Sequence, residues 1–174
     1  TDKRSWWYKM QLFNAEFHQG PLLYFDLDVV IVKNLDWMVN LPLNTFWTIR
    51  DFKYLFRPHH VGVNSSIMYW DTRRFGHVWT EFEKQNVYNM IARYHGDQDY
   101  ITEAIPAEKR KFFDQDKITS YRWQALDGGY NFTRKYYYKP DSGVNVGDST
   151  SVLVFHGKPK PGDITDPYIQ SMWK

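Results

Sequence analysis

The feature that most constrains the fold is a pair of acids placed between two short apolar runs. Residues 22–25 (Leu-Leu-Tyr-Phe) lead directly into Asp26, Leu27 and Asp28, and the β-branched run 29–32 (Val-Val-Ile-Val) follows at once. A continuous apolar run of this kind is typical of a strand that is buried on both faces. Because residues two apart in an extended chain point to the same side, the sequence predicts two carboxylates aimed at one point at the end of a buried strand.

Two carboxylates held so close together repel each other unless a cation or a proton lies between them. The ends of strands are where α/β sheets bind their ligands, and carboxylate oxygens are suitable ligands for Mg²⁺ and Mn²⁺. We therefore predict that Asp26 and Asp28 bind a divalent metal ion. The alternative is a solvated turn that contains two acids.

A second polar segment follows the apolar run 152–155. His156 offers a neutral imidazole as a third metal ligand, Gly157 permits close approach of the backbone to a ligand, and Lys158 offers a point charge to a phosphate. The alternative is a surface histidine at the start of a tail that is stiffened by prolines.

Two further polar segments are candidates for contacts with a polyhydroxylated substrate. An acidic segment lies at the expected start of a helix and consists of Asp97, Gln98 and Asp99. A small polar segment leads into an expected strand and consists of Asn64, Ser65 and Ser66. Acids at a helix start also stabilise the helix dipole, and small polar residues are common in turns, so purely structural roles stay open for both segments.

The rest of the sequence predicts strands mixed with helices. Apolar residues at helical spacing predict one amphipathic helix over 75–94 with Asp71 as its N-cap, while Asp166 and Pro167 predict the start of a last helix. Further strands are expected at 45–49, 66–70, 117–121 and 151–155, and further helical segments at 6–13, 35–39 and 97–105. No interior linker is long or polar enough to divide the chain, so residues 1–174 are predicted to form a single α/β domain.

Composition excludes several classes of protein. An apolar fraction of 43% is too high for a disordered chain, and a net charge of +2 without a long basic run argues against nucleic-acid binding. No apolar run approaches the length of about 18 residues that predicts a transmembrane helix. The absence of cysteine excludes disulfide bonds and thiolate metal sites and, with no signal-peptide pattern in residues 1–8, favours a cytoplasmic location.

Six segments occur in a characteristic order along the chain. They are residues 6–13 (WWYKMQLF), 23–30 (LYFDLDVV), 64–66 (NSS), 96–99 (GDQD), 120–123 (SYRW) and 155–161 (FHGKPKP). This ordered set resembles bacterial and viral GT-A glycosyltransferases of the DxD type, akin to the family-8 galactosyl and glucosyl transferases. The resemblance extends over residues 4–162.

The resemblance implies a GT-A-like, Rossmann-like fold, in which a mixed sheet is flanked by helices. It implies sugar transfer from a nucleotide-diphosphate sugar to a saccharide or other hydroxyl acceptor, with Mn²⁺ (or Mg²⁺) held by Asp26, Asp28 and His156. Further residues that it places around the donor are Lys9, Asn64, Ser65, Ser66, Gly157 and Lys158, with Asp97, Gln98 and Asp99 beside the donor sugar as catalytic residues. Retention of the anomeric configuration is the outcome that family 8 implies.

Members of this family have a nucleotide-binding βαβ half ahead of the helix that matches residues 6–13, and this sequence starts almost at that helix. We therefore expect an N-terminally truncated catalytic domain with weak activity of its own. We also expect a homo-oligomer, formed through the surface that the absent half would cover.

Two other functions stay open. A haloacid-dehalogenase-like phosphatase also has an apolar strand that ends in DxD, although its usual Asp-x-Asp-Gly-Thr is not matched, because Val29 and Val30 follow here. A non-catalytic carbohydrate-binding module would use some of the aromatic residues, which make up 19% of the chain, for sugar stacking without a metal.

Overall fold

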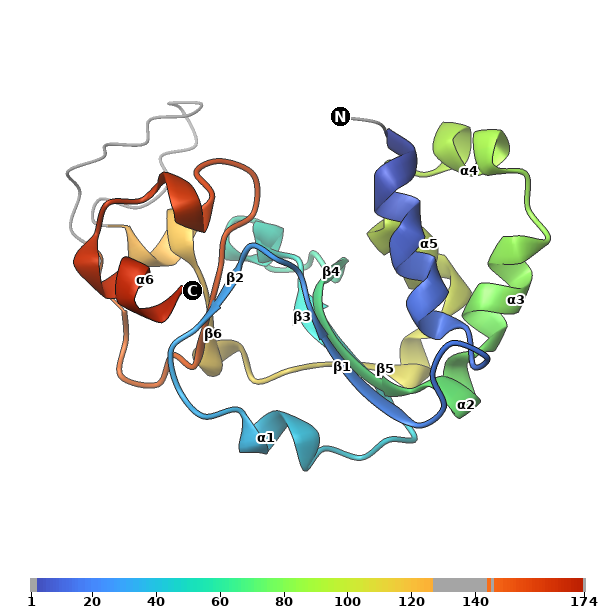
Figure 1. The fold of residues 1–174 in the computed structure, drawn as a ribbon, viewed down its shortest axis with the longest axis horizontal. Coiled ribbons are helices and arrows are strands. Elements are labelled where there is room, and N and C mark those ends of the chain that lie inside the picture. The colour runs from blue at the N-terminus through green and yellow to red at the C-terminus, as the bar shows by residue number, and fades with distance from the viewer. Residues whose placement is uncertain (1–2, 127–143, 145, 174) are drawn as a thin grey trace. The chain divides into compact units, whose positions relative to one another are not determined.

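A computed structural model describes residues 3–126, 144 and 146–173 of the chain (Figure 1). The chain divides into two compact units. Unit 1 is formed by residues 1–24 and 38–113, and unit 2 is formed by residues 25–37 and 114–174. The single-domain organisation stays a prediction, which a test for two-state unfolding would check.

Unit 1 contains a four-stranded sheet in the order β1-β4-β3-β5. Its strands are β1 (Pro21–Phe25), β3 (Phe46–Arg50), β4 (Val63–Asp71) and β5 (Arg110–Phe112). β3 pairs with β4 in the antiparallel and with β5 in the parallel direction, which makes the sheet mixed. β4 lies inside the sheet and is buried along almost its whole length, with small polar residues at 64–66 and apolar residues at 67–70.

Helices of unit 1 pack against this sheet and against one another, with the N-terminal helix beside α3 and α5 (Figure 1). They are η1 (Lys3–Phe13), η2 (Phe52–Leu55), α2 (Thr72–Phe75), α3 (His77–Glu83), α4 (Val87–Arg93), α5 (Asp97–Ala104) and η3 (Ala107–Lys109). Aromatic rings fill the core between the layers: Phe13 stacks on Trp70 at 4.7 Å between centroids, and Trp7 stacks on Phe82 at 5.6 Å. Stacked pairs of this kind add to the free energy gained from burial.

The predicted single helix over 75–94 is wrong, because three short helices occupy that stretch. Gly76 separates α2 from α3, and α3 ends at Glu83 with Lys84 as its C-cap. The side chain of Asn86 then caps α4 by accepting a hydrogen bond from the backbone N–H of Tyr88. The apolar spacing was read correctly as amphipathic, but a polar stretch with a good N-cap residue starts a new helix inside it.

The strand predicted at 22–25 exists as β1, but it is not buried on both faces. β1 lies at the edge of its sheet, and its apolar side chains are only half-buried. The edge strand β5 was not predicted at all. Its sequence, Arg-Lys-Phe, is too short and too basic to show a strand pattern.

Unit 2 contains a three-stranded sheet in the order β2-β7-β6. Its strands are β2 (Val29–Ile31), β6 (Ile118–Ser120) and β7 (Val152–Val154). β7 is antiparallel to β2 and parallel to β6, and all three of its residues are buried.

Short helical segments cover this smaller sheet. They are η4 (Gln115–Lys117), the π-helix η5 (Tyr121–Ala125), η6 (Pro161–Asp163) and α6 (Pro167–Met172). The division between the two units falls within α1 (Asp36–Val39), after residue 37. Tyr121 stacks on Phe155 at 4.1 Å. Asp166 caps α6 as predicted, by accepting hydrogen bonds from the N–H groups of Tyr168 and Ile169. None of the helices in the described part of the chain has the length and apolar character needed to cross a membrane.

The aromatic cluster at the start of η1 is divided between core and surface. Trp7 is 5% exposed, whereas Trp6 is 48% and Tyr8 is 68% exposed. Exposed aromatic side chains of this size are a candidate contact surface. The predicted homo-oligomer stays a prediction, and light scattering over a concentration series would test it.

Candidate functional site

The two acids of the DxD segment lie in the turn that joins β1 to β2. The turn is closed by a hydrogen bond of 3.2 Å from the N–H of Val29 to the carbonyl of Asp26, and it leaves Leu27 95% exposed. The N–H of Phe155 donates to the carbonyl of Asp28 at 3.0 Å. This bond extends the β2–β7 pairing by one step and fixes Asp28 beside the segment that contains His156.

The carboxylate of Asp28 is unevenly satisfied. Its Oδ2 atom forms an ion pair with the Nζ atom of Lys160, whereas its Oδ1 atom is buried and has no hydrogen-bond partner among the described residues. A buried carboxylate oxygen without a partner is costly, because it has lost its bonds to water. An unpartnered carboxylate oxygen is the kind of atom that binds divalent cations, so its chemistry is compatible with the metal site that the sequence predicts.

His156 lies at the end of β7, where its ring contacts the end of the neighbouring strand β6. Its Nε2 atom is 2.7 Å from the hydroxyl oxygen of Ser120, and the ring of Trp123 meets the imidazole edge-on at 4.3 Å between centroids. Ser120 is fully buried. The serine and the tryptophan together fix the orientation of the imidazole.

The two lysines after Gly157 occupy different surroundings. Lys158 has a side chain that is 81% exposed, and its Nζ atom is 3.4 Å from an oxygen of Asp163. Lys160 instead reaches Asp28. The backbone N–H of Lys160 and the side chain of Lys158 both donate to Asp163, and these bonds hold the pKa of that carboxyl below its usual value.

Gly157 is required by its backbone conformation. Its φ angle is +78°, in the left-handed region that side-chain-bearing residues rarely adopt. A Cβ atom at this position would also lie 3.0 Å from the Nη1 atom of Arg122. The glycine thus allows the segment after His156 to turn closely past Arg122.

The three predicted metal ligands are not gathered into one cluster. Within residues 3–126, 144 and 146–173, no three His, Asp or Glu side chains lie close enough together to hold a metal ion. In the described structure, Lys160 pairs with one oxygen of Asp28, and one ring nitrogen of His156 is bonded to Ser120. Binding by all three ligands therefore needs these side chains to rearrange.

A second group of predicted site residues comes together in unit 1, where η1, β4 and α5 meet. The Nζ atom of Lys9 lies 3.1 Å from Oδ2 of Asp97 and 3.2 Å from Oγ of Ser65, and the Ser65 hydroxyl donates to the same Asp97 oxygen at 2.6 Å. The Lys9 and Asp97 side chains are each only 13% exposed. This is a compact, charge-balanced network in which both partners are largely shielded from water.

The other candidates in unit 1 have local partners. The side chain of Asn64 accepts a hydrogen bond from the N–H of Ser66 at 2.9 Å, which shapes the entry into the inner part of β4. The side chain of Asp99 accepts from the N–H of His95 at 3.1 Å, and the carbonyl of Gln98 accepts from Thr102 within α5. Asp97 is the residue of its segment that joins the network with Lys9.

Sequence reasoning missed two residues that the structure brings to the candidate site in unit 2. Ser120 lies at the end of β6, which runs parallel to β7, so it reaches the same edge of the sheet as His156. Lys160 lies two residues beyond Lys158, the lysine that the sequence assigned to a phosphate, and forms an ion pair with Asp28. A strand-end pattern could have indicated Ser120, whereas no pattern distinguishes the two lysines.

No protein-family model matches this sequence, and no curated protein matches it either. Solved structures do share its fold. The galactosyltransferase LgtC in complex with donor and acceptor sugar analogues is 15% identical, with a TM-score of 0.57 over 95% of this chain and 63% of that one. An active-site mutant of LgtC, Q189E, is 13% identical, with a TM-score of 0.57 over 94% of this chain and 63% of that one.

The bifunctional glycosyltransferase WbbM in its apo form is 10% identical, with a TM-score of 0.60 over 97% of this chain and 37% of that one. The chain thus spans less than two thirds of the length of each of these proteins. Because nearly the whole chain is covered each time, the predicted GT-A-like α/β fold, with mixed sheets flanked by helices, is confirmed.

Proposed function

We propose that this chain takes part in the metal-dependent transfer of a sugar from a nucleotide-diphosphate sugar to a hydroxyl acceptor. The observation that carries the proposal is the state of Asp28, whose Oδ1 atom is buried without a partner while Oδ2 faces a lysine. A site that combines an under-satisfied carboxylate with a nearby ammonium suits a cation together with the phosphates that it binds. The shared fold with LgtC and WbbM supports the same reaction class.

In the proposed site, Asp26, Asp28 and His156 hold Mn²⁺ or Mg²⁺. When bound, such an ion neutralises the charge that a leaving diphosphate gains as its bond to the sugar breaks. Lys160 would then leave Asp28, and its ammonium group would pair with the oxygens of the diphosphate. Ser120 orients the imidazole of His156, in the way that outer partners orient metal-binding histidines.

The transfer itself breaks the bond between the anomeric carbon and the phosphate oxygen, and the diphosphate keeps the electron pair. The acceptor oxygen forms the new bond to the anomeric carbon, and its proton passes to the leaving diphosphate. We propose that Asp97, Gln98 and Asp99 contact the donor sugar, with Lys9 and residues 64–66 as further donor contacts. Lys9 and Ser65 already bond to Asp97, which fixes the direction of its carboxylate.

The test is release of UDP from a panel of UDP-sugars with Mn²⁺, followed over hours so that slow turnover is also detected. We expect release that depends on the metal and is lost in Asp28→Asn. The matched control is Asp36→Asn, an exposed aspartate of the same unit. Hydrolysis of p-nitrophenyl phosphate without release of UDP would instead establish the phosphatase alternative.

A further inference from the structure

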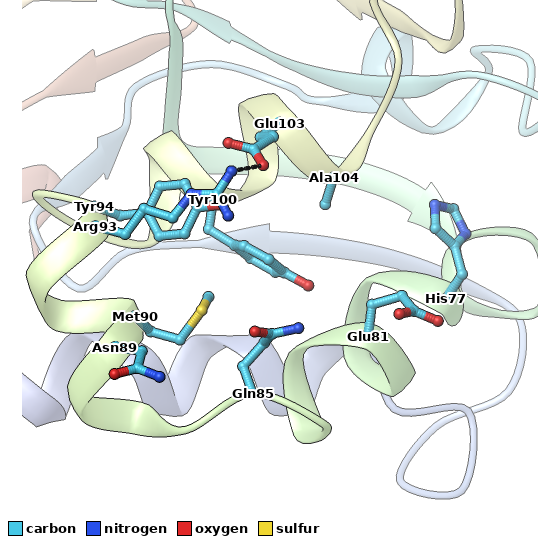
Figure 2. Close-up of a pocket in the computed structure, with 10 residues that line it drawn as sticks. All are labelled: His77, Glu81, Gln85, Asn89, Met90, Arg93, Tyr94, Tyr100, Glu103 and Ala104. Carbon is cyan, nitrogen blue, oxygen red and sulfur yellow. Dashed lines mark hydrogen bonds and ion pairs between the residues drawn. The ribbon is translucent and has the colours of Figure 1, made fainter.

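Unit 1 contains a cavity of about 420 Å³ that none of the residues assigned to sugar transfer lines. Helices α3, α4 and α5 form its walls (Figure 2). A cavity of this size is within the range of about 300–1,000 Å³ that small-molecule sites occupy.

The floor of the cavity is aromatic and apolar. Tyr100 and Met90 are almost fully buried, at 6% and 3% exposed, and Tyr94 lies beside them. Figure 2 shows the Tyr100 ring at the centre of the lining residues, between Arg93 and Tyr94 on one side and His77 on the other. The Tyr100 hydroxyl donates to the carbonyl of Val78 at 2.9 Å, so the ring is held in place.

The rim of the cavity is polar and exposed. Gln85 and Asn89 present side-chain amides, and an ion pair between Arg93 and Glu103 joins α4 to α5 at one side (Figure 2). Each amide offers both hydrogen-bond donors and an acceptor, and so does each hydroxyl group of a sugar. The carboxylates of Glu81 and Glu103 accept hydrogen bonds and the guanidinium of Arg93 donates them, so further hydroxyl groups of a polyhydroxylated ligand also find partners.

The electrostatic character of the cavity disfavours anions. Glu81 and Glu103 line it, and burial together with these two carboxylates and Tyr94 raises the pKa of Tyr100 to about 12. Burial and Glu103 also raise the pKa of Tyr94. The carboxylates of Glu81 and Glu103 oppose a phosphate, whereas the guanidinium of Arg93 opposes a simple cation.

We propose that this cavity binds a neutral saccharide, with the apolar face of a pyranose ring against Tyr94, Tyr100 and Met90 and its hydroxyl groups bonded to Gln85 and Asn89. An apolar floor with a few convergent polar groups is the usual make-up of a small-molecule site. The proposal stands apart from the transferase activity, because no metal and no nucleotide enters it.

The experiment follows the backbone amide resonances of Tyr94 and Tyr100 by NMR during titration with methyl galactoside, methyl glucoside, lactose or maltose, without metal or nucleotide. We expect at least one saccharide to shift both amides. The double variant Gln85→Ala/Asn89→Ala should lower its affinity by at least about tenfold, which corresponds to about 1.4 kcal/mol. Glu83→Ala is the matched control, because Glu83 is an exposed residue of α3 outside the cavity lining.

Asp28→Asn separates this cavity from the proposed transfer site, since it should leave saccharide binding here unchanged. Three results would overturn the proposal: no response to any of these saccharides, equal binding by the double variant, or binding of choline chloride or inorganic phosphate in place of the sugars. Because Gln85 and Asn89 are exposed, their replacement leaves the packing of the core intact.

Discussion

Asp97 in unit 1 and Asp28 in unit 2 are carboxylates in opposite situations. Oδ2 of Asp97 is bonded by both Lys9 and Ser65, at 3.1 and 2.6 Å. Asp28 has one oxygen paired with Lys160 and the other buried without a partner in the described structure. A satisfied network stabilises the unit that contains it, whereas an unsatisfied oxygen indicates where a ligand belongs. The difference separates a carboxylate whose oxygen already has two partners from one whose buried oxygen has none among the described residues.

The largest expected effect is the loss of stability when Asp97, the carboxylate with two partners, is replaced. Asp97→Ala leaves Lys9 with a largely buried ammonium that has lost its carboxylate, so we expect the free energy of unfolding to fall by about 3 kcal/mol. Denaturant titration measures this change. The double variant Lys9→Met/Asp97→Ala should recover most of the loss, because the uncompensated charge is then gone.

A control for that prediction is Glu103→Ala, which breaks the exposed ion pair with Arg93 and should cost less than about 1 kcal/mol. If Asp97→Ala costs no more than this control, the network of Lys9, Ser65 and Asp97 does not stabilise unit 1, and the contrast with Asp28 fails.

The second largest expected effect is a loss of metal affinity when Asp28, the carboxylate with an unpartnered oxygen, is replaced. Asp28→Asn should lower the affinity for Mn²⁺ by at least about 100-fold, since removing a ligand costs more than the 10–100-fold lost with its outer partners. Isothermal titration calorimetry measures the affinity, and Asp36→Asn is the control that should bind as the native chain does. Unchanged Mn²⁺ affinity in Asp28→Asn would remove the metal assignment.

Lys160 provides a smaller and more specific test. It competes with a cation for Asp28, so Lys160→Gln should raise the affinity for Mn²⁺ alone by about fivefold, equivalent to ~1 kcal/mol for a partly exposed pair. Lys158→Gln should have no effect, because its side chain is exposed and pairs with Asp163. A lower affinity in Lys160→Gln would show that the lysine helps to form the metal site instead of competing with it.

The smallest effect concerns a second satisfied carboxylate in unit 1, the N-cap Asp71. Nε and Nη2 of Arg73 donate hydrogen bonds to Oδ1 and Oδ2 of Asp71, at 2.9 and 2.6 Å. This side-chain bonding is the main cause of the lowered pKa of Asp71. A lowered pKa in the folded state means that this stabilisation is present above the pKa of the unfolded chain and is lost as the pH falls through the folded value.

Asp71→Asn keeps an acceptor for the cap but removes the charge. We therefore expect it to cost about 1 kcal/mol at neutral pH. The stabilities of the two chains should converge in acid below the ordinary aspartate pKa of 3.8. Denaturant titrations at several pH values measure the difference, and a gap that does not close in acid would show that the carboxylate charge is not its source.

The sequence predicted strand and helix positions best where a single residue type decides them. The β-branched runs at β2 and β7 and the caps Asp71 and Asp166 were placed correctly, because their local physics is strong. The three short helices of 72–93 were read as one, because periodicity reports which side of a segment is apolar and not whether it is interrupted. Burial of β1 was overestimated, since the position of a strand within its sheet is a tertiary property.

For the candidate site, the sequence identified residues but not their partners. Lys9, Ser65 and Asp97 were each singled out, yet their mutual network depends on how η1, β4 and α5 pack. Ser120 and Lys160 became visible only through contacts with His156 and Asp28, which join residues far apart in the chain.

The pairing of β2 with β7 has a consequence for how the chain is made. β2 leaves the ribosome early, but its partner β7 is synthesised late, because Val29 pairs with Val154. Residues 38–113 of unit 1 emerge between them and are able to fold first. The apolar residues of β2 therefore stay unpaired until β7 has been synthesised. Pairings between residues so far apart in the chain form slowly. The hydrogen bond from Phe155 to Asp28 forms only after residues 38–113 have been made, so the unpartnered oxygen of Asp28 reaches its final surroundings after unit 1 is able to fold.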